Sequence, residues 1–164
     1  MLDLIRARRS IRKYTSEPVA DAQVQALLEA AMSAPSASNL QPWEFVVVRD
    51  RGLCQKLAET HQWSRMCAGA AAVFVVCGQE KHSGHWVEDT SAATENLLLA
   101  ITALGMGAVW VAVYPHADRE AYVRQVLGVP DDRRILCLVP AGHPAESKPP
   151  HTKYDPGRVH YDRW

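Results

Sequence analysis

Apolar residues recur every three or four positions between residues 19 and 34, which is the spacing of one face of an amphipathic helix. The apolar positions are Val24, Leu27, Leu28, Ala31 and Met32. The predicted helix ends at Ala34, because Pro35 disfavours helical geometry in the residue before it. A shorter helix is predicted over residues 1–8.

Runs rich in β-branched and aromatic residues predict four strands, over residues 43–49, 71–77, 108–113 and 134–142. Helices are expected between them, from the cap Asp50 to about Thr60, over 87–104, and over 118–127. Helices and strands do not alternate strictly as βαβ units. We therefore expect an α+β sandwich with a central sheet that is antiparallel or mixed, and one domain over residues 1–164.

The longest uncharged stretch, residues 97–115, approaches the length of a membrane span. Gly105 and Gly107 divide it into a Leu/Ala-rich half that favours a helix and a Val/Trp-rich half that favours a strand. No positively charged flank anchors it in a bilayer. We interpret it as the end of a long buried helix, a tight turn and a buried strand.

Composition narrows the classes of function. The chain has 18 basic and 18 acidic residues, whereas a nucleic-acid or membrane-surface protein usually shows a basic excess. The N-terminus lacks the apolar segment and cleavage site of a signal peptide. The cysteines form no CxxC pair and are too sparse for a secreted disulfide scaffold, so we expect a cytoplasmic protein. They are Cys54, Cys67, Cys77 and Cys137.

Positive charge is concentrated in RRSIRKY, residues 8–14. Fork-shaped arginine donors and the Ser10 hydroxyl suit a phosphate group, although a solvated basic surface would give the same pattern. The stretch SAPSASNLQPWEF, residues 33–45, surrounds the end of a predicted helix with small polar residues. Its Asn39 and Gln41 amides could pair with the edge of a flat heterocycle, and a simple helix stop and turn is the alternative.

Together these motifs resemble the nitroreductase family of FMN-dependent flavoenzymes. RRSIRKY, a helix and then APSASNLQPWEF are similar to the family's N-terminal signature. ATENLLLAITALGMGAVWVAVYP is similar to its central helix and following strand, and GHPAESKPP to the turn after its last strand. The resemblance covers most of the chain in the same order. It implies an α+β homodimer with two FMN sites at the subunit interface and a C-terminal tail that extends onto the partner subunit.

The resemblance also implies roles for the basic cluster. Arg8, Arg9 and Ser10 would hold the FMN phosphate and ribityl chain, and Arg12 would face the pyrimidine side of the ring. The two ends of FMN both carry or acquire negative charge, which explains why a neutral chain concentrates cations here.

Other segments would complete the site by the same resemblance. The partner subunit would supply Pro35, Ser36 and Asn39. The strand after the central helix would approach the flavin ring through its backbone, at Trp110, Val111, Ala112 and Val113. The family often has glycine where Ala112 stands. The tail would reach the phosphate through Lys153, with His151 beside it, where the family commonly has arginine.

The implied activity is hydride transfer from NAD(P)H through bound FMN to nitroaromatic, quinone or similar acceptors by a ping-pong mechanism, with no catalytic acid or base. A non-catalytic FMN-binding storage or sensor protein is the alternative. The connection over residues 78–86 is short, so we expect an open pocket with His85 and Trp86 as candidate lid residues. No metal is expected, because His82 and His85 lack further ligands at suitable spacing.

Overall fold

Five strands form one antiparallel sheet in the computed structural model, which describes residues 1–164. Strand β5 (Arg134–Gly142) has β2 (Ala72–Gly78) on one side and two short strands, β3 (Gly107–Ala108) and β4 (Val111–Ala112), on the other. The strand β1 (Trp43–Val48) pairs with β2 and forms the far edge.

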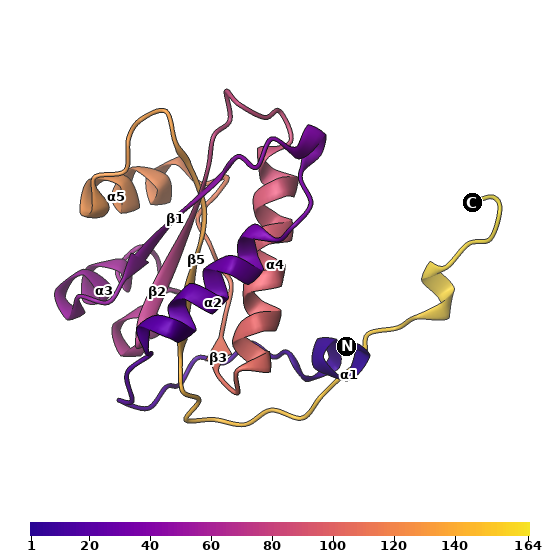
Figure 1. Ribbon diagram of the computed structural model, residues 1–164, viewed down its shortest axis with the longest axis horizontal. Helices are drawn as coiled ribbons and strands as arrows, with labels where there is room; N and C mark the ends of the chain where they lie inside the picture. The colour runs from indigo at the N-terminus through magenta and orange to yellow at the C-terminus, as the bar shows by residue number, and fades with distance from the viewer.

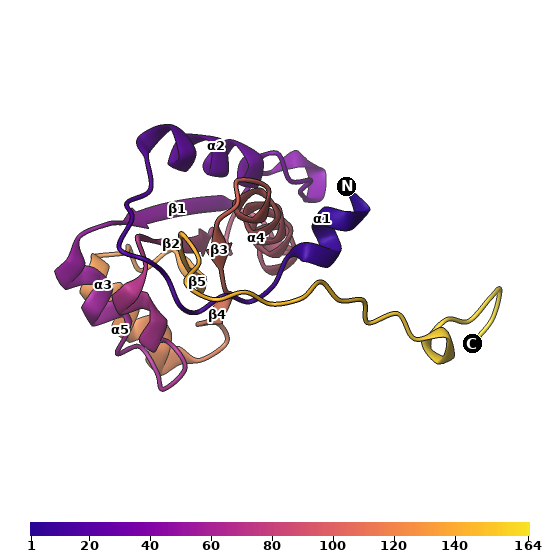
Figure 2. The ribbon, with the colours of Figure 1, turned by 90° about the horizontal axis from the view of Figure 1, so that it is seen from below.

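Helices cover both faces of this sheet, as Figures 1 and 2 show. The helices α2 (Asp21–Met32) and α4 (Trp86–Ala103) pack together on one face, and α3 (Arg51–Leu57) and α5 (Ala117–Leu127) lie on the other. The short α1 (Leu2–Ala7) packs against α4. Three short 3₁₀ turns complete the chain: η1 (Ala37–Asn39), η2 (Arg65–Gly69) and η3 (Pro156–Arg158).

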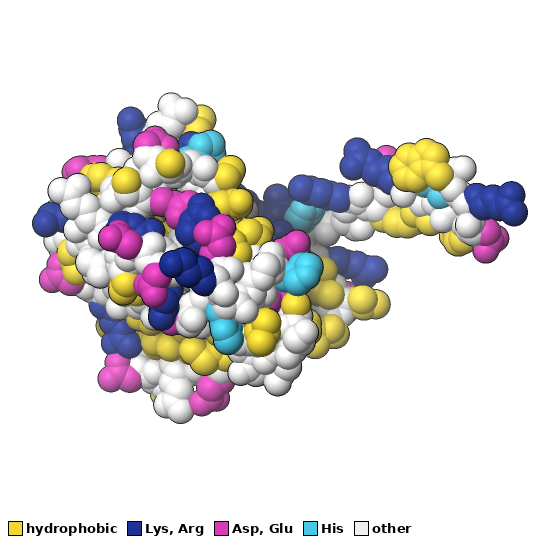
Figure 3. Space-filling model, turned by 90° about the horizontal axis from the view of Figure 1, so that it is seen from above, with side chains coloured by type: hydrophobic (Ala, Val, Ile, Leu, Met, Phe, Trp, Pro, Cys, Tyr) yellow, Lys and Arg dark blue, Asp and Glu magenta, His cyan; other side chains and the backbone are white.

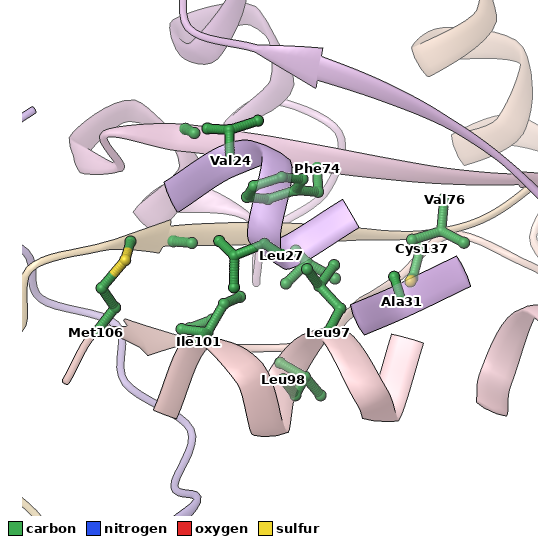
Figure 4. Close-up of a cluster of buried hydrophobic side chains, with 14 of the residues drawn as sticks. Val24, Leu27, Ala31, Phe74, Val76, Leu97, Leu98, Ile101, Met106 and Cys137 are labelled. Atoms are coloured by element: carbon green, nitrogen blue, oxygen red, sulfur yellow. The ribbon is translucent and has the colours of Figure 1, made fainter. Parts of the chain in front are cut away.

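The core divides into two apolar layers because successive residues of a strand point to opposite faces of a sheet. Every residue of β2 is buried. Phe74 and Val76 face the α2 and α4 side, where Figure 4 shows them with Leu27 and Leu97. Val73 and Val75 belong to the layer under α3 and α5. A strand buried on both faces explains the continuous apolar run in its sequence.

The expected α+β sandwich is confirmed, with two differences in its elements. The predicted strand 108–113 is two short strands interrupted at Val109 and Trp110. The register places Val109 opposite Pro140, which has no N–H to donate to the ladder. The helix capped by Asp50 ends at Leu57 rather than near Thr60, although Asp50 accepts the Leu53 N–H as a cap should.

The region around α4 contains one confirmation and one correction. The uncharged stretch 97–115 divides into the end of α4, a turn with Gly105 at φ +71° and the β3–β4 segment. None of the helices has the length and apolar character needed to cross a membrane. Trp86 was expected to cover the pocket but is buried in the core, with its ring edge-on to Tyr114. The lid assignment of Trp86 is therefore wrong.

The C-terminal residues 151–164 extend away from the body of the chain, as all three whole-molecule views show. Figure 3 shows basic and hydrophobic side chains along this arm. Tyr161 is 81% exposed and Trp164 is fully exposed. Large aromatic side chains in such a position are typical of a segment that packs on another surface.

Candidate functional site

A basic pocket of about 310 Å³ lies where the N-terminal basic cluster meets the start of the tail. We call it the anion pocket. No hydrophobic residue lines it. Its lining residues are Arg8, Arg9, Ser10, Arg12, Lys148, His151 and Lys153. The structure thus brings together the basic cluster and both tail residues that the sequence indicated.

Two chain segments distant in the sequence form a clasp that shapes the anion pocket. Residues 9–15 run beside residues 143–149, and Ala145 N–H donates to the Lys13 carbonyl at 2.8 Å. Glu146 accepts the backbone N–H of Arg12 at 2.6 Å, and Lys148 Nζ donates to the Ser10 carbonyl. Arg9 in turn donates to the Pro149 carbonyl. The backbone of the basic cluster is therefore fixed by the segment after β5.

The basic cluster is also tied to the edge of the sheet. Ile11 N–H donates to the Ala108 carbonyl at 2.9 Å, and Ser10 forms a parallel bridge to Ala108. This approach needs glycine at position 107, because a Cβ there would lie 2.6 Å from Ile11 Cγ2. The turn between α4 and β3 thus sets the position of the cluster.

The charges in the anion pocket are only partly neutralised by the protein. Arg8 lies 3.7 Å from Glu95, and Lys148 lies 3.4 Å from Glu146. Arg9, Arg12 and Lys153 have no carboxylate within ion-pair distance. The Nδ1 atom of His151 is buried without a hydrogen-bond partner. The pocket therefore has spare positive charge and an unsatisfied polar atom, as an anion-binding site should.

Two residues at the anion pocket, His151 and Glu146, have shifted pKa values. The pKa of His151 lies below its ordinary value, because its surroundings desolvate it and Arg9 and Lys153 disfavour a further positive charge. The pKa of Glu146 is also lowered, mainly because its carboxylate accepts the Arg12 N–H, with Lys148 adding to the effect. At neutral pH the clasp therefore contains an ionised glutamate and the pocket a neutral histidine.

A second pocket of about 470 Å³ adjoins the first, and Arg12 lines both. We call it the ring pocket. It lies between the β3–β4 edge, the loop that leads into η2 and the start of α5. Its lining residues are Arg12, His61, Gln62, Trp63, Arg65, Met66, Val109, Trp110, Val111, Ala112 and Arg119. A mostly apolar pocket that also contains arginines suits a flat heteroaromatic ring with polar edges.

One wall of the ring pocket is held by specific hydrogen bonds. Arg119 donates to the Ala112 carbonyl at 3.1 Å. The Trp63 backbone N–H donates to His61 Nδ1 at 3.1 Å, so Nδ1 is an acceptor and the ring proton lies on Nε2. Burial and the nearby Arg119 and His116 lower the pKa of His61. Nε2 is buried beside the Ala112 backbone and makes no hydrogen bond of normal geometry.

The remaining predicted site residues line neither the anion pocket nor the ring pocket. Val113 is fully buried in the core beneath α3 and α5, its N–H donates to the Leu136 carbonyl, and it does not line the ring pocket. Pro35, Ser36 and Asn39 line neither pocket. They lie near the beginning of α4, where the Ala37 N–H donates to Asp89. Arg8 instead lies next to Glu95, further along the same helix. Their supply by a partner subunit stays a prediction.

Comparison with known proteins shows which family the chain belongs to. The model of the nitroreductase family matches residues 5–66 and 55–143. The chain belongs to the nitroreductase family. A protein of Archaeoglobus fulgidus named "Putative NADH dehydrogenase/NAD(P)H nitroreductase" is 41% identical over 99% of this chain and 98% of its own length.

Two solved structures extend the comparison to the fold. An FMN-dependent nitroreductase from Clostridium difficile superposes with a TM-score of 0.96 at 28% identity, and the match covers all of both chains. The NADPH:FMN oxidoreductase of Vibrio harveyi, solved with NAD⁺, superposes with a TM-score of 0.88 at 26% identity over 99% of this chain and 77% of that one.

Sequence reasoning missed several residues that line the pockets of this nitroreductase family member. Lys148 belongs to the turn after β5, and it reaches the anion pocket only because this segment pairs with residues 9–15. The others are His61, Gln62, Trp63, Arg65, Met66, Val109 and Arg119. Arg65 and Arg119 are far apart in the sequence and share no motif, so the sequence gives no local sign that they line one pocket.

Proposed function

We propose that this member of the nitroreductase family is an FMN-dependent oxidoreductase that transfers hydride from NAD(P)H to nitroaromatic, quinone or similar acceptors by a ping-pong mechanism. When bound, FMN supplies the redox chemistry by accepting a hydride from NAD(P)H and passing two electrons to the acceptor. The observation that carries the proposal is the continuity of an anion pocket and a ring pocket, joined at Arg12.

The anion pocket fits the phosphate end of FMN. A phosphate monoester carries about two negative charges at neutral pH and three acceptor oxygens. Arg9 and Lys153 supply positive charge that no carboxylate of the chain neutralises, and the unpartnered Nδ1 of His151 lies among them. The donor set and its charge therefore match a phosphate.

The ring pocket fits the other end of FMN. Met66, Val109 and Trp110 give an apolar part of the lining, and Arg12 and Arg65 add positive charge to it. A fixed cation stabilises negative charge that develops on a neighbouring ring, because it needs no reorganisation when that charge appears. We therefore expect Arg12 and Arg65 to raise the reduction potential of a bound flavin.

No acidic residue lines either pocket. The reaction does not need one, because an acceptor such as a quinone takes up one hydride equivalent from NAD(P)H and one proton from water to give a hydroquinone and NAD(P)⁺. The side chains of this protein bind and orient the two reactants in turn, and the proton comes from solvent. Because donor and acceptor use the same space, the oxidised donor leaves before the acceptor binds, which is a ping-pong order.

We propose that the active form is a homodimer in which Pro35, Ser36 and Asn39 of one subunit complete the FMN site of the other. Two features support a partner surface. Helix α1 has no buried residue and exposes Leu2 and Ile5. The tail with Trp164 extends beyond the body of its own chain.

The experiment that tests the function is an absorbance spectrum of the purified protein in the absence of oxygen, before and after NADH or NADPH is added. Flavin bands that disappear on addition, and return when a quinone is added, support the oxidoreductase. Bound flavin that resists both donors would instead indicate a storage or sensor protein. Failure to bind added FMN would refute the proposal in either form.

A further inference from the structure

We propose that the ring pocket selects acceptors that combine an aromatic ring with a carboxylate, and that Arg119 is the residue that pairs with the carboxylate. This inference rests on the proposed function and names the class of acceptor. It is carried by an excess of positive charge in the ring pocket, by spare hydrogen-bond donors on its wall, and by an exposed aromatic residue at the same wall.

The charge of the ring pocket exceeds what a flavin ring requires. Arg12, Arg65 and Arg119 line it, and no aspartate or glutamate does. An oxidised flavin ring is neutral, and reduction adds about one negative charge near neutral pH. The pocket therefore retains net positive charge in the state that binds the donor and in the state that binds the acceptor. Such a field attracts anionic ligands and concentrates them at the site.

Arg119 is the member of this group that is free to meet a second ligand. It lies in the first turn of α5 and lines the ring pocket alone, whereas Arg12 also lines the anion pocket. One N–H of its guanidinium group donates to the Ala112 carbonyl at 3.1 Å. Arg119 takes part in no ion pair, and its remaining N–H groups make no hydrogen bond within the chain. Two parallel N–H groups of arginine match a carboxylate.

His61 supplies a second donor beside Arg119. Its Nδ1 accepts the Trp63 N–H, which leaves the proton on Nε2, and Nε2 is buried beside the Ala112 backbone without a hydrogen bond of normal geometry. The charged or titratable groups that influence His61 are Arg119, His116 and Asp118. Of these, only Arg119 lines the ring pocket. A buried donor whose contact with the protein is this weak is stabilised by an additional acceptor.

Trp63 explains why the expected acceptor is aromatic. Its side chain is 69% exposed although the residue lines the ring pocket, and its backbone is held by the bond to His61. An exposed indole beside an apolar slot offers a flat surface on which an aromatic ring can stack. The combination of Trp63, His61 and Arg119 thus matches the two parts of an aromatic carboxylate.

The test compares 4-nitrobenzoate with 4-nitrobenzamide, which have similar shapes but differ in charge. We expect the FMN-loaded protein to prefer the benzoate in kcat/KM, and Arg119→Gln to reduce this preference about tenfold, as the loss of a charge-assisted contact predicts. Arg119→Lys keeps the charge and should retain most of the preference. Arg49→Gln removes an exposed arginine that lines neither pocket and is the matched control.

Binding without turnover gives an independent readout. Calorimetry of benzoate and benzamide with the oxidised protein should show the same preference and the same dependence on Arg119. Equal affinity for both probes, or a preference that Arg119→Gln leaves intact, would overturn the inference. A variant that changes the ratio of NADPH to NADH in the donor reaction, but not the ratio of benzoate to benzamide, would assign Arg119 to the donor phosphate and also overturn it.

The outcome is distinguishable from a failure of the proposed function. A protein that neither binds FMN nor reacts with NAD(P)H would refute the proposed function itself. A protein that reduces both nitro compounds equally well would remain an FMN-dependent oxidoreductase, and only the anionic acceptor class would be wrong.

Discussion

Gly107→Ala tests whether the edge of the sheet positions the basic cluster. A Cβ at this position would lie 2.6 Å from Cγ2, 2.7 Å from Cβ and 3.0 Å from Cγ1 of Ile11. Ile11 is buried, and its Cβ is bonded to the backbone, so no side-chain rotation relieves the contact. The backbone of Ile11 itself has to move.

The size of that movement follows from the same distances. Ordinary contact begins near 3.4 Å, so Ile11 must withdraw by about 0.8 Å. A shift of that size away from Ala108 would lengthen the 2.9 Å bond from Ile11 N–H to the Ala108 carbonyl beyond hydrogen-bond distance. Overpacking of this kind costs about 1–3 kcal/mol of the free energy of unfolding.

Two assays measure the effect. Urea denaturation of Gly107→Ala should show the lower free energy of unfolding, and titration with FMN should show an affinity weakened at least about tenfold, because the arginines move with Ile11. Gly69→Ala is the matched control, since nothing lies within 4 Å of a Cβ there. Adding Ile11→Ala should rescue only part of the loss, because its Cβ remains in contact. If Gly107→Ala behaves like Gly69→Ala in both assays, this account of the site's position is wrong.

Three further predictions concern the pockets and the tail. Arg8→Ala should weaken FMN binding by roughly 1.5–3 kcal/mol through loss of a charge-assisted contact, and an affinity equal to that of an Arg49→Ala control would contradict its role. The lowered pKa of Glu146 means that its support of Arg12 is present above its ordinary pKa of 4.5 and is lost as the pH falls through the lower folded value. FMN affinity measured as the pH is lowered from 7 to well below 4.5 should therefore show an acid-dependent loss, beginning below 4.5, that is smaller in Glu146→Gln. Parallel curves would refute this. Truncation before Gly157 should raise the dimer dissociation constant in analytical ultracentrifugation, and an unchanged constant would show that the tail does not bind the partner.

Much of the fold could be predicted because helices and strands leave local patterns. The spacing of Val24, Leu27 and Ala31 gave α2, and all three are buried. The apolar run that became β2 and the glycine-closed helix α5 were equally clear, and Gly128 has the left-handed φ of +68° expected at a helix end. Each of these features is decided by residues within a few positions of one another.

The site was only partly predictable, because its geometry depends on pairings between distant segments. RRSIRKY was recognisable as a cation cluster, but Lys148 joins it only through the clasp of residues 9–15 with 143–149. Likewise, Arg65 and Arg119 meet at the ring pocket because α5 lies next to the loop before η2. Their separation of 54 positions leaves no local signal.

The sequence by itself thus determined the elements, the basic cluster and the resemblance to a flavoenzyme family. Only the tertiary structure decided that Pro140 stands opposite Val109 and interrupts the predicted strand there, that Trp86 is a core residue, and that a neutral chain gathers three arginines around one pocket. The physical reason is that periodicity follows from the fixed repeat of a helix or strand, and capping from hydrogen bonds between near neighbours. Strand register and pocket lining are set by contacts whose partners come together only on folding.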